Sequence, residues 1–92
     1  MYTMAMRLVP DSANAEADAE VINSLIQASV YPEDHVEHVY VSATNSQCDI
    51  IVFFTNSDLA AVQVIGTALS SRLIGKYPPG WTLVTVAFSS VA

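Results

Sequence analysis

The chain has few cationic side chains, a single cysteine and only three glycines. Its basic residues are Arg7, Arg72 and Lys76, too few and too scattered for the cationic surface that nucleic-acid binding needs. Cys48 alone cannot form an intramolecular disulfide or a multi-cysteine metal site, which favours a reducing, cytoplasmic location. The dispersed glycines do not form a phosphate-binding loop. The sequence therefore predicts no nucleic-acid partner and no cofactor.

Long apolar runs are also missing. The longest, from Ile50 to Phe54, is far shorter than the roughly 20 residues of a membrane-spanning helix. The start of the chain lacks the basic segment followed by an apolar stretch that marks a secretory signal. We therefore expect a chain that neither crosses a membrane nor is secreted. Its 92 residues leave room for one domain, over residues 1–92.

Apolar side chains are abundant. They make up 52% of the chain, and charged residues only 13%, where about a quarter is typical. One small core does not need this much apolar surface, so the composition predicts burial against a second subunit or another protein. The whole net charge of −6 comes from residues 1–46, where Arg7 is the only basic residue. The seven acidic residues of this part are Asp11, Glu16, Asp18, Glu20, Glu33, Asp34 and Glu37.

Two kinds of periodicity divide the chain. Apolar and polar residues alternate with the period of two typical of strands over residues 2–9, 35–43, 47–55 and 81–89. A first helix is expected after a cap at Asp11 or Ser12 and ends before Pro32. A second is expected after Asn56 or Ser57 and stops at Gly75.

The resulting order βαββαβ predicts an α+β fold. Right-handed crossovers would place both helices on one face of a four-stranded antiparallel sheet with strand order 4-1-3-2. This arrangement looks like the ferredoxin-like fold over essentially the whole chain. That fold hosts unrelated enzymes, regulators and RNA binders, so it implies no particular function.

The alternation also assigns the two faces of the sheet. The more apolar side should face the helices and contain Met4, Met6, Leu8, Val39, Val41, Ile50, Val52, Phe54, Val84, Val86 and Phe88. The other side should remain open and contain Ala5, Arg7, Val9, His38, Tyr40, Asp49, Ile51, Phe53, Trp81, Leu83 and Thr85. Such an open side is more apolar than a soluble monomer usually exposes.

The open side contains the only candidates for catalysis. Small dimeric proteins of this general shape include dabb-type barrels, which hold a polycyclic or haem-like ligand over this face, where a His, a Tyr and an Arg could act in proton transfer. The candidates here are Arg7, His38, Tyr40 and Asp49. In the simpler alternative, Arg7 and Asp49 form an ion pair between neighbouring strands, and His38 and Tyr40 line a subunit interface. We favour this alternative because 92 residues leave little loop with which to build a pocket.

Other chemistry finds weaker support. His35 and His38 are three residues apart, so a strand would point them to opposite faces and no metal site is expected. Glu33, Asp34 and Glu37 fit a solvated acidic corner. Cys48 falls on the core side as a small hydrophobe.

The aromatic residues Tyr40, Phe53 and Trp81 are arranged as in RNA-recognition sheets, but the acidic charge of the chain argues against RNA.

The leading hypothesis is a non-catalytic interaction or regulatory module that forms a homodimer, or binds another protein, through the open side of its sheet. The expected interface residues are Tyr40, Ile51, Phe53, Trp81 and Leu83. The first alternative is a small dabb-like domain, ligand-binding or enzymatic, whose dimer encloses an apolar pocket. The second is an acidic inhibitor that mimics nucleic acid toward a basic partner.

Overall fold

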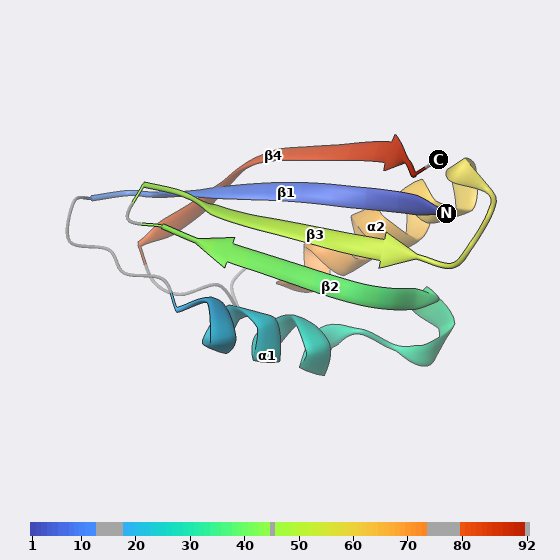
Figure 1. The fold of residues 1–92 in the computed structure, drawn as a ribbon, viewed down its shortest axis with the longest axis horizontal. Coiled ribbons are helices and arrows are strands. Elements are labelled where there is room, and N and C mark those ends of the chain that lie inside the picture. Colours follow the sequence, from blue (N-terminus) through green and yellow to red (C-terminus); the bar gives the residue numbers. More distant parts are fainter. Residues whose placement is uncertain (13–17, 45, 74–79, 92) are drawn as a thin grey trace.

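The computed structural model describes residues 1–12, 18–44, 46–73 and 80–91. The elements follow one another as β1 (Tyr2–Pro10), α1 (Ala19–Ser29), η1 (Pro32–Asp34), β2 (Val36–Ala43), β3 (Cys48–Phe54), α2 (Leu59–Leu73) and β4 (Trp81–Ser90), where η1 is a 3-10 helix. The strands form an antiparallel sheet in the order β2-β3-β1-β4, which is the predicted order counted from the other edge. Figure 1 looks onto this sheet, with α2 behind it. The predicted α+β arrangement is confirmed.

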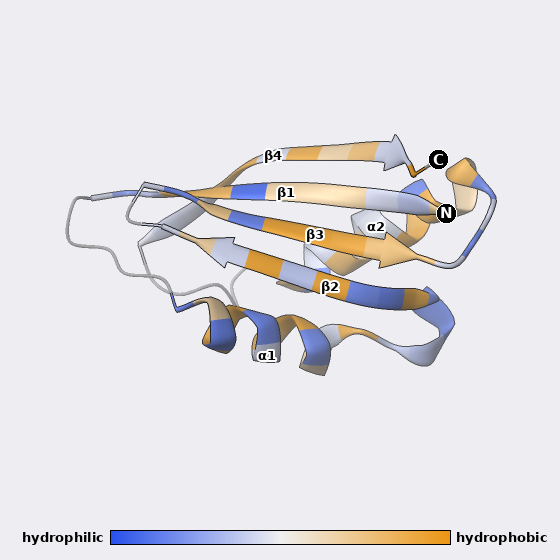
Figure 2. Ribbon diagram, in the orientation of Figure 1, coloured by the Kyte–Doolittle hydropathy of each residue, from blue (hydrophilic) through white to orange (hydrophobic). Residues whose placement is uncertain are grey.

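The core lies between the sheet and the two helices. β1 and β3 alternate as predicted, so that Met4, Met6 and Leu8 face the helices beside Ile50, Val52 and Phe54, all at most 1% exposed. On β2, Val39 is buried and Val41 packs against the cluster. Figure 2 shows the hydrophobic colouring concentrated along β3, the strand between β1 and β2. The two central strands therefore supply most of the sheet's share of the core.

Helix α1 begins later than predicted. Its N-cap is Asp18, whose carboxylate accepts a hydrogen bond from the backbone N–H of Glu20 at 2.9 Å, and neither Asp11 nor Ser12 caps it. The stretch expected to form its first turns, residues 13–17, lies outside the described residues. Ile22, Ile26 and Ser29 form its buried face, whereas Val21 is exposed.

Helix α2 comes close to the sheet through its small residues. Asp58 caps it by accepting a hydrogen bond from Ala60 N–H at 3.1 Å. The buried face contains Gly66 and Ser70, and a Cβ added to Gly66 would lie 2.7 Å from Cε1 of Phe88 and 2.8 Å from Sδ of Met4. Its predicted stop at Gly75 lies outside the described residues. No helix in the described ranges is long and apolar enough to cross a membrane.

The predicted facing of β4 is wrong at its start. Arg7 pairs with Thr85 but Leu8 pairs with Leu83, so Val84 is an extra residue that forms a β-bulge. The bulge reverses the alternation: Trp81 and Leu83 turn toward the helices, where Trp81 is 7% exposed in the core cluster and Leu83 packs against it. Val84 and Val86, both predicted to be in the core, are 49% and 41% exposed.

The predicted acidic corner is not wholly solvated. Asp34 is 6% exposed and accepts hydrogen bonds from the backbone N–H of Tyr31 and from Nη2 of Arg72, both at 2.7 Å. The guanidinium of Arg72 also lies over the Tyr31 ring, 4.1 Å from its centroid. His35, expected within a strand, adopts a left-handed conformation with φ of 56° before β2 begins. The contacts of Arg72 with Asp34 and Tyr31 hold η1 against α2.

We expect Gly66→Ala to destabilise the protein by about 1 kcal/mol. The added methyl group would overpack the contact with Phe88, at a cost of about 1–3 kcal/mol, and this outweighs a gain of about 1 kcal/mol in helix propensity. Urea unfolding measures the change. In a Phe88→Ala background the cost of the same substitution should fall, because only the contact with Sδ of Met4 remains. A Gly66→Ala variant more stable than the parent chain would contradict the close approach.

Removal of the Asp34 carboxylate by Asp34→Ala should cost about 2–4 kcal/mol in unfolding free energy. The change leaves the charge of Arg72 half-buried without its partner, and such losses are expensive. Thermal or urea unfolding measures it, with Glu33→Ala, at an exposed neighbouring carboxylate, as the matched control. Equal stability of the two variants would show that the Asp34–Arg72 pair does not hold η1 to α2.

Candidate functional site

The sheet has an open face, on the side away from the helices. Residues directly opposite one another in an antiparallel sheet share a face, so the registers arrange this one in three rows across β2, β3, β1 and β4. The rows are Ser42, Asp49, Arg7 and Thr85; Tyr40, Ile51, Ala5 and Ala87; and His38, Phe53, Thr3 and Ser89. We call the first the charged row.

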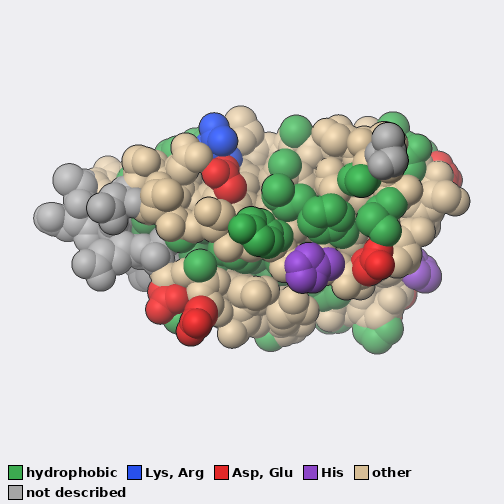
Figure 3. Space-filling view, in the orientation of Figure 1, with side chains coloured by type: hydrophobic (Ala, Val, Ile, Leu, Met, Phe, Trp, Pro, Cys, Tyr) green, Lys and Arg blue, Asp and Glu red, His purple; other side chains and the backbone are tan. Residues whose placement is uncertain are grey.

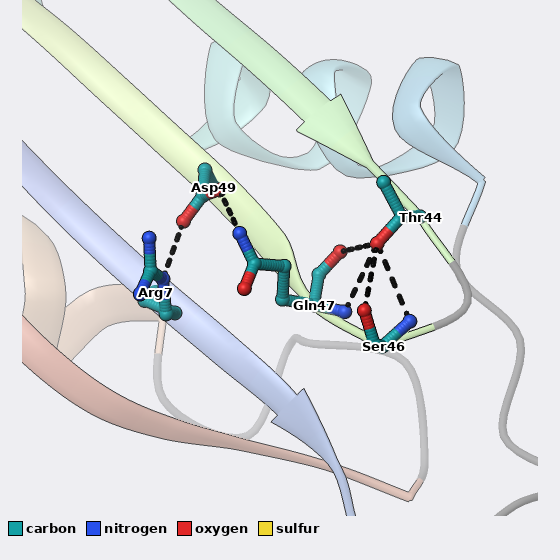
Figure 4. Close-up of polar contacts among 5 residues, drawn as sticks. All are labelled: Arg7, Thr44, Ser46, Gln47 and Asp49. Atoms are coloured by element: carbon teal, nitrogen blue, oxygen red, sulfur yellow. Dashed lines mark hydrogen bonds and ion pairs between the residues drawn. The ribbon is translucent and has the colours of Figure 1, made fainter.

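The charged row contains the predicted ion pair. Nε of Arg7 donates to Oδ1 of Asp49 at 2.8 Å, and Nε2 of Gln47 donates to Oδ2 of the same carboxylate at 2.8 Å (Figure 4). Nearby, the Thr44 hydroxyl accepts from the backbone N–H of Ser46, and Thr44 N–H donates to the carbonyl of Gln47 at 2.8 Å, which closes the β2–β3 hairpin. Asp49 is therefore held from two sides, at one end of the open face.

Large side chains gather on the β2 and β3 half of the face. Tyr40 is 57% exposed, and Ile51 and Phe53 are half-buried beside it. The rings of His38 and Phe53 lie 6.0 Å apart between centroids, tilted by 48°. Figure 3 shows hydrophobic side chains running along the middle of this face, with a histidine at their border. We call His38, Tyr40, Ile51 and Phe53 the large half.

The β1 and β4 half of the face has small side chains: Thr3, Ala5, Ala87 and Ser89, which we call the small half. Ala5 and Ala87 are directly opposite each other and line a hollow of about 340 Å³, which Arg7, Asp49, Ile51 and Thr85 also line. A second hollow, of about 420 Å³, lies beside Met1, Glu37, His38 and Phe53. The side chains are thus larger on the β2 and β3 half than on the β1 and β4 half, and each half borders one hollow.

The four residues considered for catalysis do not form one constellation. Arg7 and Asp49 bond to each other and line the first hollow, whereas His38 lines the second. Tyr40 is in the middle row, on β2, so that β3 separates it from β1, the strand of Arg7. His38 contacts the ring of Phe53. The arrangement joins the ion pair that the sequence predicts and separates it from His38 and Tyr40.

The expected interface residues lie on two different faces of the sheet. Tyr40, Ile51 and Phe53 lie on the open face, whereas Trp81 and Leu83 lie on the helix side because of the bulge at Val84. Alternation in β4 could have identified Ala87 and Ser89, which the interface prediction omitted.

No protein-family model and no curated protein sequence matches this chain. Among the residues that the structure describes, no group of three or more histidine, cysteine, aspartate or glutamate side chains is placed to hold a metal ion. The open face itself is therefore what the functional argument rests on.

Cys48 lies beneath the charged row, on the core side of β3. It is fully buried, and this burial raises the pKa of its thiol, which the neighbouring Asp49 carboxylate raises further. Because the thiolate is the reactive form, a buried thiol with a raised pKa reacts slowly. Cys48 is thus a packing residue, as the sequence predicts.

We expect the Cys48 thiol of the native protein to react with iodoacetamide at pH 8 at least about 100-fold more slowly than the same protein in urea. Mass spectrometry of timed samples measures the alkylated fraction. A native rate close to the denatured rate would place this thiol at the surface or give it an activating neighbour, against the burial described above.

Proposed function

We propose that this chain is a ferredoxin-like α+β domain that acts as a non-catalytic interaction module in the cytoplasm and self-associates through its open face. One observation carries the proposal: the large half places half-buried Ile51 and Phe53, and exposed Tyr40, side by side on a face that no helix covers. Removing such side chains from water favours association by about 25 cal/mol per Å² of apolar surface.

The position of the apolar side chains supports this choice of surface. Other exposed large apolar residues include Val21 on α1, Val64 on α2, and Val84 and Val86 on β4. Single exposed apolar residues are ordinary in soluble proteins, whereas contiguous ones mark interaction sites. Only the open face combines neighbouring apolar side chains from β2 and β3 with a bordering ion pair, among the described surfaces.

A second candidate function, a ligand-binding dimer of the dabb type, is favoured by the hollow of about 340 Å³ beside Arg7. Its volume falls in the range of small-molecule pockets, about 300–1,000 Å³. This candidate requires Arg7, His38 and Tyr40 to meet around one ligand across a dimer. Native mass spectrometry separates the two: retained small-molecule mass that disappears in His38→Ala favours the ligand, and a dimer of bare chains favours the interaction module.

We expect Phe53→Asp to weaken self-association by about 100-fold or more, because it places a charge where an aromatic ring would be buried. Sedimentation equilibrium over a wide concentration range measures the dissociation constant. The matched control is Val64→Asp, which adds the same charge at a residue of α2 that is 72% exposed, and it should leave association unchanged.

Circular dichroism of each variant is the control for correct folding. Tyr40→Glu provides a second test, because Tyr40 is more exposed than Phe53 and contributes less to the fold. A wild-type chain that remains monomeric at high concentration would overturn self-association. Equal effects of Phe53→Asp and Val64→Asp would show that the open face is not the surface used.

A further inference from the structure

The two halves of the open face differ in side-chain size, row by row. In the middle row, Tyr40 and Ile51 lie on β2 and β3, and Ala5 and Ala87 lie on β1 and β4. In the next row, His38 and Phe53 are followed by Thr3 and Ser89. A surface that matches this face needs small side chains opposite the large half and large ones opposite the small half.

A second copy of the chain has this surface. We infer that the partner of the open face is another copy, related by a two-fold axis that lies in the interface between β1 and β3 and runs along the strands. This inference rests on the proposed function. Such an axis keeps each row in place and exchanges its two ends, so that Ile51 of one copy lies over Ala5 of the other, and Tyr40 over Ala87.

The same axis pairs the charged row with itself. Arg7 and Asp49 are directly opposite on β1 and β3, so the rotation places Arg7 over Asp49 of the second copy and Asp49 over its Arg7. An axis across the strands would instead keep β1 over β1 and β3 over β3, so the large half would face the large half and Arg7 would not face Asp49. Size and charge therefore select the same one of the two possible axes.

The guanidinium of Arg7 has hydrogen-bond donors available for this contact. Only its Nε bonds to Asp49, and within the described ranges its two terminal amino groups have no partner. Half of its side chain is exposed, and about a third of that of Asp49. Guanidinium groups bind carboxylates best through two parallel hydrogen bonds, so a second carboxylate facing Arg7 would complete its coordination. The dimer would join two ion pairs into a four-charge network.

The net charge of −6 does not oppose this contact locally. Arg7 and Asp49 cancel on the face itself. Glu37 borders the face beside His38, whereas Asp18 and Glu20 lie at the start of α1, Glu33 lies in η1 and Asp58 lies before α2. Over a screening length of about 8 Å at physiological salt, their repulsion across a dimer is weak.

The face is also large enough. Four strands about 4.8 Å apart and about seven residues long, at about 3.4 Å each, cover roughly 19 by 24 Å. Two such faces would bury about 900 Å² in total even if they were flat, which exceeds the roughly 800 Å² that crystal-packing contacts usually bury. Uneven side chains increase this toward the range of stable complexes, about 1,200–2,000 Å².

Charge reversal tests the pairing. Arg7→Glu places a second carboxylate over Asp49 of an identical copy, and Asp49→Arg places two arginines together, so each variant alone should dissociate about 100-fold more readily. An equimolar mixture of the two should form a heterodimer, because every reversed charge then faces an opposite one. Sedimentation equilibrium and native mass spectrometry measure both. Glu33→Arg, a charge reversal away from the face, is the matched control and should not weaken association.

A cross-linking experiment tests the direction of the axis. Tyr40→Cys and Ala87→Cys, mixed as separate chains and treated with a short bismaleimide, should give linked heterodimers, whereas Tyr40→Cys alone should give few. The wild-type chain, whose only cysteine is buried, is the blank. Efficient linking of Tyr40→Cys to itself would overturn the proposed axis and favour the one across the strands.

The outcomes separate this inference from the proposed function. The mixed charge variants could fail to associate while Phe53→Asp still weakens association relative to the wild type. In that case the open face is used with another geometry, and this inference fails while the proposed function stands. If the wild type remains monomeric at high concentration, both fail. Heterodimers in the charge mixture together with Tyr40–Ala87 cross-links support the stated dimer.

Discussion

Both helices pack against the same face of the sheet, and most of the structure follows from this constraint. Each helix connects two parallel strands across an intervening one, and such crossovers are right-handed in nearly all proteins. The helices therefore cover one side, and the sheet must supply apolar residues to that side from every strand. The other side receives the alternate residues without a covering layer, so its composition alone decides whether it remains exposed to solvent.

The two central strands could be predicted from the sequence because their period of two is unbroken and one side is strongly apolar. The core side is defined by Met4, Met6 and Leu8 on β1 and by Ile50 and Phe54 on β3. Arg7 and Asp49 then fall on the other side, directly opposite each other. Strand order follows from element order and handedness. The ion pair of the open face was thus within reach of sequence reasoning.

Other features depend on partners that the sequence does not name. The bulge at Val84 arises from pairing with β1, and residues 81–89 alternate without any glycine or proline that marks a bulge. Capping residues are frequent before α1, so the use of Asp18 instead of Asp11 is not distinguished locally. The burial of Asp34 requires Arg72, 38 residues later in the chain. For the bulge and for Asp34, a contact distant in sequence decides the outcome.

The bulge connects the core to the shape of the open face. If β4 alternated without interruption, Trp81 and Leu83 would extend the apolar open face on the β4 side, and the core would lose both. The extra residue turns both toward the core, while Thr85, Ala87 and Ser89 lie on the open face. A domain this small buries only about two-thirds of its unfolded surface, so an added Trp in the core matters to its stability. The same local irregularity thus adds two large apolar side chains to the core of the monomer and removes them from the open face beside the charged row, so that the large side chains of that face remain on β2 and β3.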